Sequence, residues 1–173
     1  MRGYFGIGVE RLSKPTNAGN LFRTAHAFGG SFVFTVNTLP HKERLYSDTS
    51  NSFENMPYYA WDTVDEMMLP KGCALVGIEL LDDAIDLPEF RHPRSCAYVL
   101  GPEQGSLSEA VLEKCQYTIK IPAKFCVNVA IAGAIVMYDR MRSLGAYAAR
   151  PLMEGGDASP AQPHRFGHSS ERS

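Results

Sequence analysis

Two stretches of the sequence decide the fold: Leu100-Gly-Pro-Glu-Gln-Gly-Ser-Leu107 and Ile121-Pro-Ala-Lys-Phe-Cys-Val-Asn128. In each, the end of an apolar, strand-like run enters a turn that contains Gly or Pro, and a helical pattern follows the turn. The carboxyl ends of strands are where α/β proteins bind ligands. Because the two turns are close in sequence, we predict that the C-terminal third of the chain builds one small-molecule pocket.

The rest of the chain alternates between strand-like and helical patterns, which predicts an α/β fold with a parallel sheet flanked by helices. The predicted strands are residues 4–9, 31–36, 73–79, 95–100 and 117–121. The predicted helices are residues 17–28, with Asn17 as the N-cap, and residues 63–69, 108–115 and 127–142. Residues 37–59 are expected to form a long polar connection that could hold a binding loop, and residues 82–93 a loop that can include a brief strand or turn.

The helix predicted for residues 127–142 is apolar on all sides. One face carries Val127, Ala130, Ile131, Ala134, Ile135 and Tyr138, and the opposite face carries Val129, Ala132, Gly133 and Val136. A helix of this kind is buried on more than one side. We therefore expect part of it to lie in an interface between two subunits.

The composition fits a single domain. The chain has 173 residues, of which 45% are hydrophobic and 21% are charged, and these values are ordinary for a globular protein. We predict a domain over residues 1–148 and a disordered tail over residues 149–173, where Pro, Gly, Ser and His are frequent and periodicity is lost. The formal net charge of −2 gives no global signal for nucleic acid, so RNA binding would need a local basic patch or one formed between subunits.

The cysteines point to a reducing compartment. Four are present, with no CxxC spacing and no His cluster beside them, so we expect free thiols and no metal site. Free thiols favour a cytoplasmic location. The N-terminal residues lack the apolar core and cleavage site of a signal peptide, and no apolar run approaches the roughly 20 residues of a membrane span.

A first candidate site is the segment Asn17-Ala-Gly-Asn-Leu-Phe-Arg23. Arg23 lies on a predicted helix, and its guanidinium can bind a phosphate through two parallel hydrogen bonds. From this segment alone, a solvent-exposed arginine in a salt bridge is an equal alternative. Gly19 and Asn20 are poor helix formers, which indicates either a close approach to the backbone there or a later start of the helix.

The two opening turns supply a second set of candidates. Gly101 and Gly105 permit a tight turn that offers backbone groups to a polar ligand, and Glu103 could accept hydrogen bonds from neighbouring amides or orient a substrate. Asn128 needs polar partners, which are either backbone groups of a neighbouring loop or a substrate. Cys126 is a candidate nucleophile near a helix N-terminus, but no nearby His supports that alternative. Neither a P-loop nor a GxGxxG motif is present, so nothing supports a triphosphate or dinucleotide site.

Read together, the motifs resemble the SPOUT superfamily, and most closely the TrmH-type RNA 2′-O-ribose methyltransferases. The resemblance rests on Asn17-x-Gly-Asn-x-x-Arg23, then Leu100-Gly-Pro-Glu-x-Gly105, then Ile121-Pro followed by Cys126-x-Asn128 and a helix of small residues. It covers about residues 3–144, and the ordered set is more specific than any one motif. The chain is similar to the minimal members of the family that act on tRNA, and ribosomal RNA is the alternative substrate.

The resemblance implies a fold, a cofactor and an assembly. The fold is an α/β sheet whose C-terminal segment threads through a loop as a deep trefoil knot, an exception to the usual rule against threading. Members of the family are homodimers that bind S-adenosylmethionine in the knot, beside the strand end near Ile78 and Glu79. The residues implied to bind this cofactor are Ile78, Leu100, Gly101, Glu103, Gly105, Ile121, Cys126 and Asn128.

The resemblance also implies roles in the reaction. Arg23 would be the catalytic residue and would act with an RNA phosphate to help deprotonate the ribose 2′-hydroxyl. Glu103 and Asn128 would hold the site in shape. The residues implied to bind the RNA are Asn17, Lys14, Arg11 and Lys124, and Lys42 and Arg44 in the long connection would extend the positive patch.

The third motif departs from the family pattern in ways that put catalysis in question more than cofactor binding. Cys126 stands where relatives usually have Ser, Ala130 replaces a second small polar residue, and the linker after Ile121-Pro is shorter than in many relatives. A SPOUT-fold protein that binds RNA or cofactor without turnover is therefore one alternative. The other, if the motifs match by chance, is a doubly wound nucleotide-binding or flavodoxin-like protein without a knot.

Overall fold

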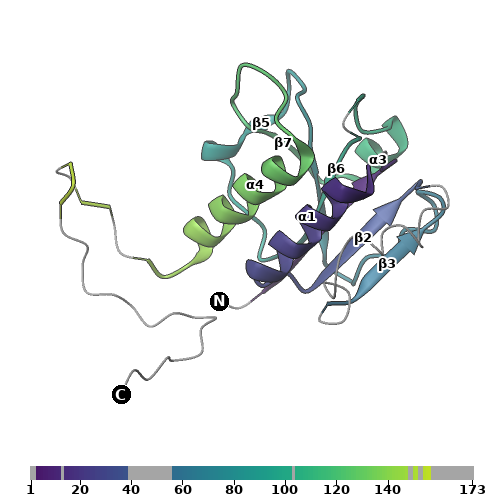
Figure 1. Ribbon diagram of the computed structural model, residues 1–173, viewed down its shortest axis with the longest axis horizontal. Coiled ribbons are helices and arrows are strands. Elements are labelled where there is room, and N and C mark those ends of the chain that lie inside the picture. The colour runs from purple at the N-terminus through teal and green to yellow at the C-terminus, as the bar shows by residue number, and fades with distance from the viewer. Residues whose placement is uncertain are drawn as a thin grey trace.

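The computed structural model describes residues 3–12, 14–38, 56–102, 104–147, 150–151 and 154–156. The strands are β1 (Tyr4–Glu10), β2 (Phe32–Val36), β3 (Tyr58–Trp61), β4 (Ala74–Ile78), β5 (Ile85–Asp86), β6 (Ser95–Leu100) and β7 (Tyr117–Lys120). The helices are α1 (Pro15–Ala27), α3 (Glu109–Lys114) and α4 (Val129–Leu144), with a 3-10 turn at Leu87–Glu89. The strands form one parallel sheet in the order β3-β2-β1-β6-β4-β7-β5 (Figure 1). The predicted parallel sheet flanked by helices is confirmed.

Strand β1 lies inside the sheet, between β2 and β6. Residues 5–10 are all buried, as expected for a strand of a parallel sheet that is covered on both faces. Two glycines make room for the neighbouring aromatic rings. A Cβ on Gly6 would come within 2.3 Å of the Phe32 ring, and one on Gly8 within 2.4 Å of the Phe34 ring. Larger residues at either position would push β2 away from β1.

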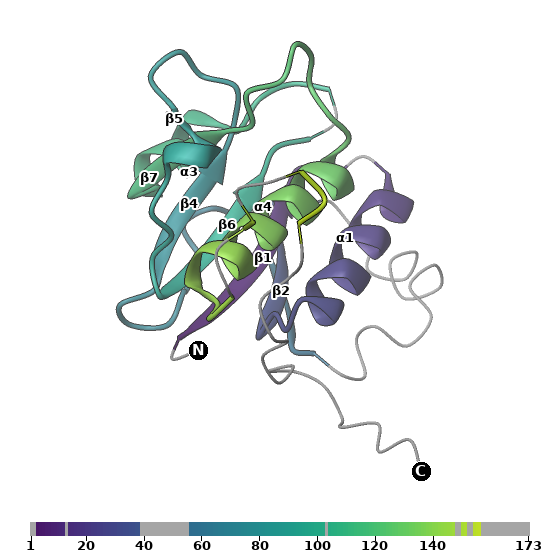
Figure 2. The same ribbon diagram turned by 90° about the vertical axis from the view of Figure 1, so that its left-hand side faces the viewer.

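The helices form one layer on each side of the sheet. Helices α1 and α4 lie side by side on one face (Figures 1 and 2), where they bury a cluster that includes Ile7, Leu21, Tyr98 and Val136. Helix α3 covers part of the other face, through Val111. The two larger helices can approach closely because Gly133 of α4 has no side chain. A Cβ at this position would come 2.2 Å from the Leu21 side chain of α1. This contact fixes the helix that carries Arg23 against the helix that follows the second opening turn.

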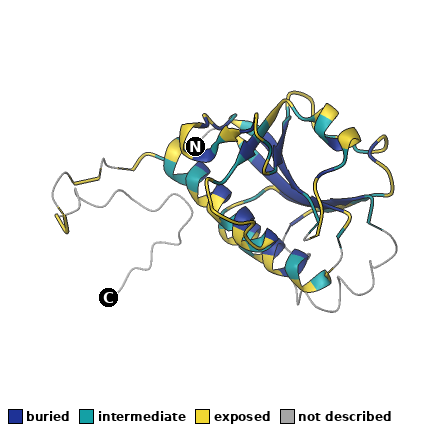
Figure 3. Ribbon diagram, turned by 90° about the horizontal axis from the view of Figure 1, so that it is seen from above, coloured by how far each residue is buried: buried dark blue, intermediate teal, exposed yellow. Residues whose placement is uncertain are grey.

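Burial is uneven around helix α4. Its inner face is buried in the core, whereas its outer face remains exposed (Figure 3). Three large apolar side chains at helical spacing lie on that outer face: Ile131 is 55% exposed, Ile135 37% and Tyr138 48%. The helix is therefore apolar on a side that the core does not cover, as the sequence predicted.

The inner face of α4 also carries a buried arginine, Arg140, which is 1% exposed. Its guanidinium donates hydrogen bonds to the carbonyl oxygens of Tyr4 (3.3 Å), Pro93 (2.5 Å) and Arg94 (2.7 Å). The Tyr98 hydroxyl lies 3.4 Å from the same group. These contacts join the C-terminal half of α4 to the N-terminal ends of β1 and β6, at the opposite edge of the sheet from the two opening turns.

The first helix starts before the predicted position, at Pro15. The expectation that Asn17 caps this helix is wrong, because Asn17 lies inside it and Lys14 occupies the cap position. Proline explains the difference. It disfavours the helical conformation in the residue before it, and its own fixed φ suits the first helical position.

Residues 56–69 also differ from the prediction. The expected helix over residues 63–69 is wrong, since this segment forms bends and turns. Pro70 disfavours a helical conformation in Leu69, and strand β3 runs to Trp61, just before this segment. Strand β3 begins at Tyr58, inside the predicted irregular connection, and pairs with β2. Lys42 and Arg44 of that connection lie outside the described residues.

The last helix begins at Val129, so Val127 precedes it. The Asn128 side chain caps the helix by accepting a hydrogen bond from the Ala130 N–H at 2.9 Å, which is the usual role of Asn at this position. No helix within the described part of the chain is long and apolar enough to cross a membrane.

Candidate functional site

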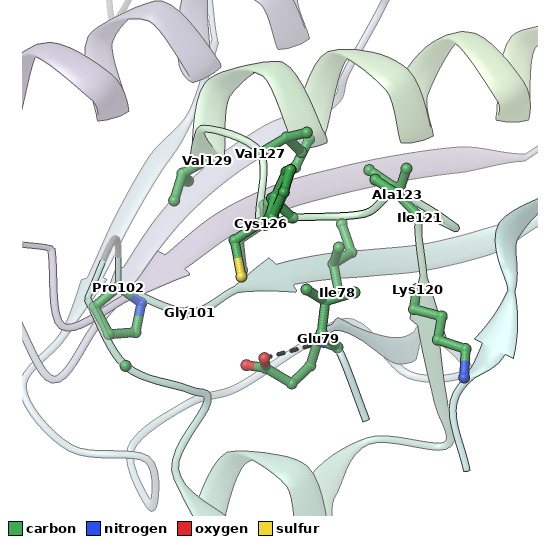
Figure 4. Close-up of a pocket in the computed structure, with 15 residues that line it drawn as sticks. Ile78, Glu79, Gly101, Pro102, Lys120, Ile121, Ala123, Cys126, Val127 and Val129 are labelled. Atoms are coloured by element: carbon green, nitrogen blue, oxygen red, sulfur yellow. Dashed lines mark hydrogen bonds between the residues drawn. The ribbon is translucent and has the colours of Figure 1, made fainter. Parts of the chain in front are cut away.

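A pocket opens at the carboxyl edge of the sheet, where β4, β6 and β7 end (Figure 4). It encloses about 640 Å³ of empty space, part of which is open to solvent. Its lining comes from three strand ends and from the start of α4: Ile78, Glu79, Leu80, Leu100, Gly101, Pro102, Gly105, Lys120, Ile121, Ala123, Phe125, Cys126, Val127, Val129 and Ala132. Both opening turns therefore contribute to a single pocket.

The turn after β6 is shaped by two glycines. A Cβ on Gly101 would lie 3.0 Å from the Leu107 nitrogen and 3.4 Å from the Glu79 Oε2 atom, so a side chain there would displace its neighbours. Gly105 has a φ of +120°, which glycine adopts far more readily than other residues. The backbone of this turn can therefore lie at the pocket surface without a side chain in between.

Two carboxylates hold the far end of the same turn. The Glu79 Oε2 atom accepts a hydrogen bond from the Leu107 N–H at 2.7 Å, and the Glu10 Oε2 atom accepts one from the Ser108 N–H at 2.7 Å. Glu10 is fully buried and also accepts a hydrogen bond from the Asn37 side chain at 3.0 Å. Hydrogen bonds to a charged acceptor are stronger than neutral ones, so the turn after β6 is fixed from β1 and from the end of β4, the two strands that flank β6.

A side-chain hydrogen bond connects the first candidate segment to the pocket. The Asn128 amide donates to the Asn17 Oδ1 atom at 3.3 Å. Because Asn128 also caps α4, this bond joins α1 to the start of the helix that closes the pocket. The sequence left open whether Asn128 binds backbone groups of a neighbouring loop or a substrate. In the structure its side chain binds the Ala130 N–H and the Asn17 side chain.

Most of the predicted cofactor-binding residues meet at this pocket. Six of them line it: Ile78, Leu100, Gly101, Gly105, Ile121 and Cys126. Asn128 follows the lining residues directly and does not line the pocket itself. Glu103 lies outside the described residues.

Cys126 is the one exposed cysteine among the four. Its sulfur points into the pocket, toward the end of β4 (Figure 4). The other thiols are shielded, and burial raises the pKa of Cys115 to about 12 and also raises the pKa of Cys96. No group of three or more potential metal ligands occurs among the described residues.

The predicted RNA-binding residues are less closely grouped. Lys14, Arg23 and Lys124 are exposed, and Arg23 lies within α1, six residues after Asn17. Arg11 makes internal contacts: its Nη2 atom donates to the Ser106 carbonyl, and its Nε atom lies 3.7 Å from the Glu10 carboxylate. Substrate binding by these residues stays a prediction.

Several residues of the site were not singled out from the sequence. The motifs assign no role to Glu10, and they include Glu79 only as part of a strand end. A charged residue at the end of an apolar strand in a parallel sheet is itself a signal, because that edge is where ligands bind. Phe125, which is 81% exposed, and Val129 carried no comparable signal.

A family model described as "SpoU rRNA Methylase family" matches residues 5–138. The chain belongs to this family. The match includes the first candidate segment and both opening turns, and residues of these two turns line the pocket.

Within the SpoU family, the chain is 24% identical over 142 residues to the tRNA (guanosine(18)-2′-O)-methyltransferase of Escherichia coli, covering 79% of this chain and 62% of that protein. The chain spans between 10% and 62% of the length of three curated relatives that it matches. It is thus similar to one part of each of these proteins.

Solved structures of SpoU-type proteins share the fold. The methyltransferase AviRb of Streptomyces viridochromogenes, in complex with AdoMet, superposes with a TM-score of 0.71 at 23% identity, over 82% of this chain and 61% of that one. A structure titled for 2-OH methylation of C/U34 on tRNA superposes with a TM-score of 0.70 at 24% identity, over 83% of this chain and 98% of that one. The seven-stranded parallel sheet is therefore the sheet of SPOUT methyltransferase structures.

Proposed function

We propose that this protein is an S-adenosylmethionine-dependent RNA 2′-O-ribose methyltransferase that acts on tRNA. The observation that carries the proposal is the single pocket at the carboxyl edge of the sheet, which gathers six residues predicted for the cofactor. Membership of the SpoU family supports the same activity. The relatives named for tRNA 2′-O methylation support the choice of RNA and of the ribose hydroxyl.

The lining of the pocket has the chemistry that S-adenosylmethionine requires. This lining is mostly apolar with few charged side chains, as is typical of small-molecule sites. Apolar side chains such as Ile78, Leu100 and Ile121 suit the faces of an adenine ring. The side-chain-free surface at Gly101 leaves backbone groups accessible to the polar edges of a ligand. The residues present therefore fit this cofactor.

When bound, S-adenosylmethionine supplies an electrophilic methyl group on its sulfonium. The protein then has to hold the ribose hydroxyl in line with that group and assist the loss of its proton. Arg23 is exposed on α1, and the Asn17–Asn128 hydrogen bond fixes that helix to the rim of the pocket. We assign Arg23 the binding of an RNA phosphate beside the reacting hydroxyl, where its charge favours the deprotonated oxygen.

The proposal is tested by methyl transfer from labelled S-adenosylmethionine to tRNA and, separately, to ribosomal RNA, followed by digestion and identification of the labelled nucleoside. We expect label on a ribose of tRNA. Arg23→Ala should lower the rate about 10²-fold or more while the dissociation constant for the cofactor stays unchanged, and the exposed Arg91→Ala serves as the charge-matched control. Cofactor binding without any transfer would favour the alternative, a binding protein without turnover.

The proposal includes a homodimer that packs through helix α4. Ile131, Ile135 and Tyr138 form an exposed apolar row on its outer face, and burial of such a row is favourable at about 25 cal/mol per Å². Ile131→Glu should therefore convert a dimer into monomers in sedimentation velocity, whereas Glu113→Gln on α3 should leave the dimer intact. A wild-type chain that is monomeric in sedimentation velocity would contradict the proposed homodimer.

The deep trefoil knot of the SPOUT fold is also part of the proposal. Its support is the position of the segment between β7 and α4. That segment lines the same pocket as the turn after β6 and the end of β4, and β7 lies between β4 and β5 in the sheet.

A further inference from the structure

Glu79 follows β4 directly and reaches across the floor of the pocket toward Gly101 (Figure 4). Its side chain is held in one orientation by two backbone groups. The Oε1 atom accepts a hydrogen bond from the Leu80 N–H at 3.0 Å, and the Oε2 atom accepts one from the Leu107 N–H at 2.7 Å. A carboxylate has about four acceptor sites, so these two bonds leave acceptor capacity for a ligand.

The charge of Glu79 is not neutralised inside the pocket. Among the described residues that line it, only Glu79 and Lys120 are charged. The Lys120 ammonium group donates hydrogen bonds to the Leu81 and Asp82 carbonyl oxygens, each at 3.1 Å, and these hold it away from the cavity (Figure 4). No described cation forms an ion pair with Glu79 within 4.0 Å.

We infer that Glu79 selects the cationic cofactor over its neutral product. S-adenosylmethionine carries a positive sulfonium, whereas S-adenosylhomocysteine, which remains after methyl transfer, has a neutral thioether. A fixed carboxylate in a largely apolar pocket attracts the first through charge and gains nothing comparable from the second. Glu79 thus favours loading of the reactive cofactor and release of the spent one. This inference rests on the proposed function.

Calorimetric titration of the full chain tests the inference without any RNA. Three probes are compared: S-adenosylmethionine, S-adenosylhomocysteine, and sinefungin, in which a protonated amine replaces the sulfonium. Glu79→Gln removes the charge and keeps an oxygen for the Leu107 N–H. Glu10→Gln is the matched control, because Glu10 holds the adjacent Ser108 N–H but does not line the pocket.

For Glu79→Gln, we expect the ratio of the two dissociation constants to shift about tenfold against S-adenosylmethionine, as for the loss of one charge at a distance of several Å. Sinefungin should follow S-adenosylmethionine. Glu10→Gln should leave the ratio unchanged even if both affinities fall. An unchanged ratio in Glu79→Gln, or an equal shift in Glu10→Gln, would overturn the inference and leave the proposed function standing. A wild-type chain that binds none of the three probes would overturn both.

Discussion

Substitution of Gly101 by alanine should weaken cofactor binding while the protein remains folded. The added Cβ would lie 3.0 Å from the Leu107 nitrogen, 3.3 Å from the Ser106 carbonyl carbon and 3.4 Å from the Glu79 Oε2 atom. Backbone atoms cannot rotate out of the way as a flexible side chain can. The segment that contains Ser106 and Leu107 must therefore shift by a few tenths of an ångström, which disturbs the hydrogen bond between the Leu107 N–H and the Glu79 carboxylate.

The magnitude follows from the bond that the shift puts at risk. The Leu107 N–H donates to the Glu79 carboxylate at 2.7 Å, and a hydrogen bond to a charged group contributes about 1.5–3 kcal/mol. Cofactor binding requires the turn in its present position, so restoring that position against the added Cβ costs about this energy, and the dissociation constant for S-adenosylmethionine should rise roughly 10- to 150-fold. Isothermal titration of the wild type and of Gly101→Ala measures this difference directly.

Gly72→Ala provides the matched control for this experiment. Gly72 has a φ of +79° and no atom within 4 Å of an added Cβ, and it lies at the N-terminal end of β4, opposite the pocket. Alanine there should cost about 1–2 kcal/mol of stability through backbone strain alone and leave the cofactor affinity unchanged. Equal cofactor affinity in Gly101→Ala and wild type, with both proteins folded, would refute the view that this turn forms the cofactor surface.

Three further predictions concern the core. Arg140→Met should lower the free energy of unfolding in urea by about 3–5 kcal/mol, because three carbonyl oxygens lose their donor, whereas Arg91→Met on the surface should change it by less than about 0.5 kcal/mol. Burial lowers the pKa of His92, so the folded protein favours the neutral imidazole. The contribution of this group to the free energy of unfolding is complete above the unfolded pKa of about 6.5 and is lost as the pH falls below that value. The urea concentration at the unfolding midpoint should therefore decrease as the pH is lowered from 7.5 to 5.5. This decrease should be smaller in His92→Gln. Gly133→Val should destabilise the protein by more than about 1 kcal/mol through overpacking against Leu21, and a thermal melt equal to that of the wild type would contradict this.

The sheet could be predicted from the sequence because local patterns determine it. Residues 96–100 form an uninterrupted apolar run, and the structure has a buried strand over Ser95–Leu100. Ser108 was correctly predicted to open a helix, since its side chain accepts the hydrogen bond that an N-cap makes, from the Val111 N–H. The pocket followed from the two strand ends, because parallel strands place their carboxyl ends at one edge of the sheet.

Other features depend on contacts that no local pattern reports. Arg140 lies in a helix with charged neighbours, and its burial comes from carbonyl groups of Tyr4, Pro93 and Arg94, which are far away in sequence. Glu10 likewise binds Ser108, 98 residues further along the chain. Strand β3 was missed because its partner, β2, supplies the pairing that a short run of four residues cannot specify by itself.

The most direct test of the proposed activity is a map of 2′-O-methyl positions in the RNA of cells that lack this protein, compared with cells complemented with the wild type or with Arg23→Ala. We predict that at least one ribose methyl group in tRNA is lost without the protein, returns with the wild type and does not return with Arg23→Ala. An identical set of 2′-O-methyl groups in all RNA of the three strains would contradict the proposed function.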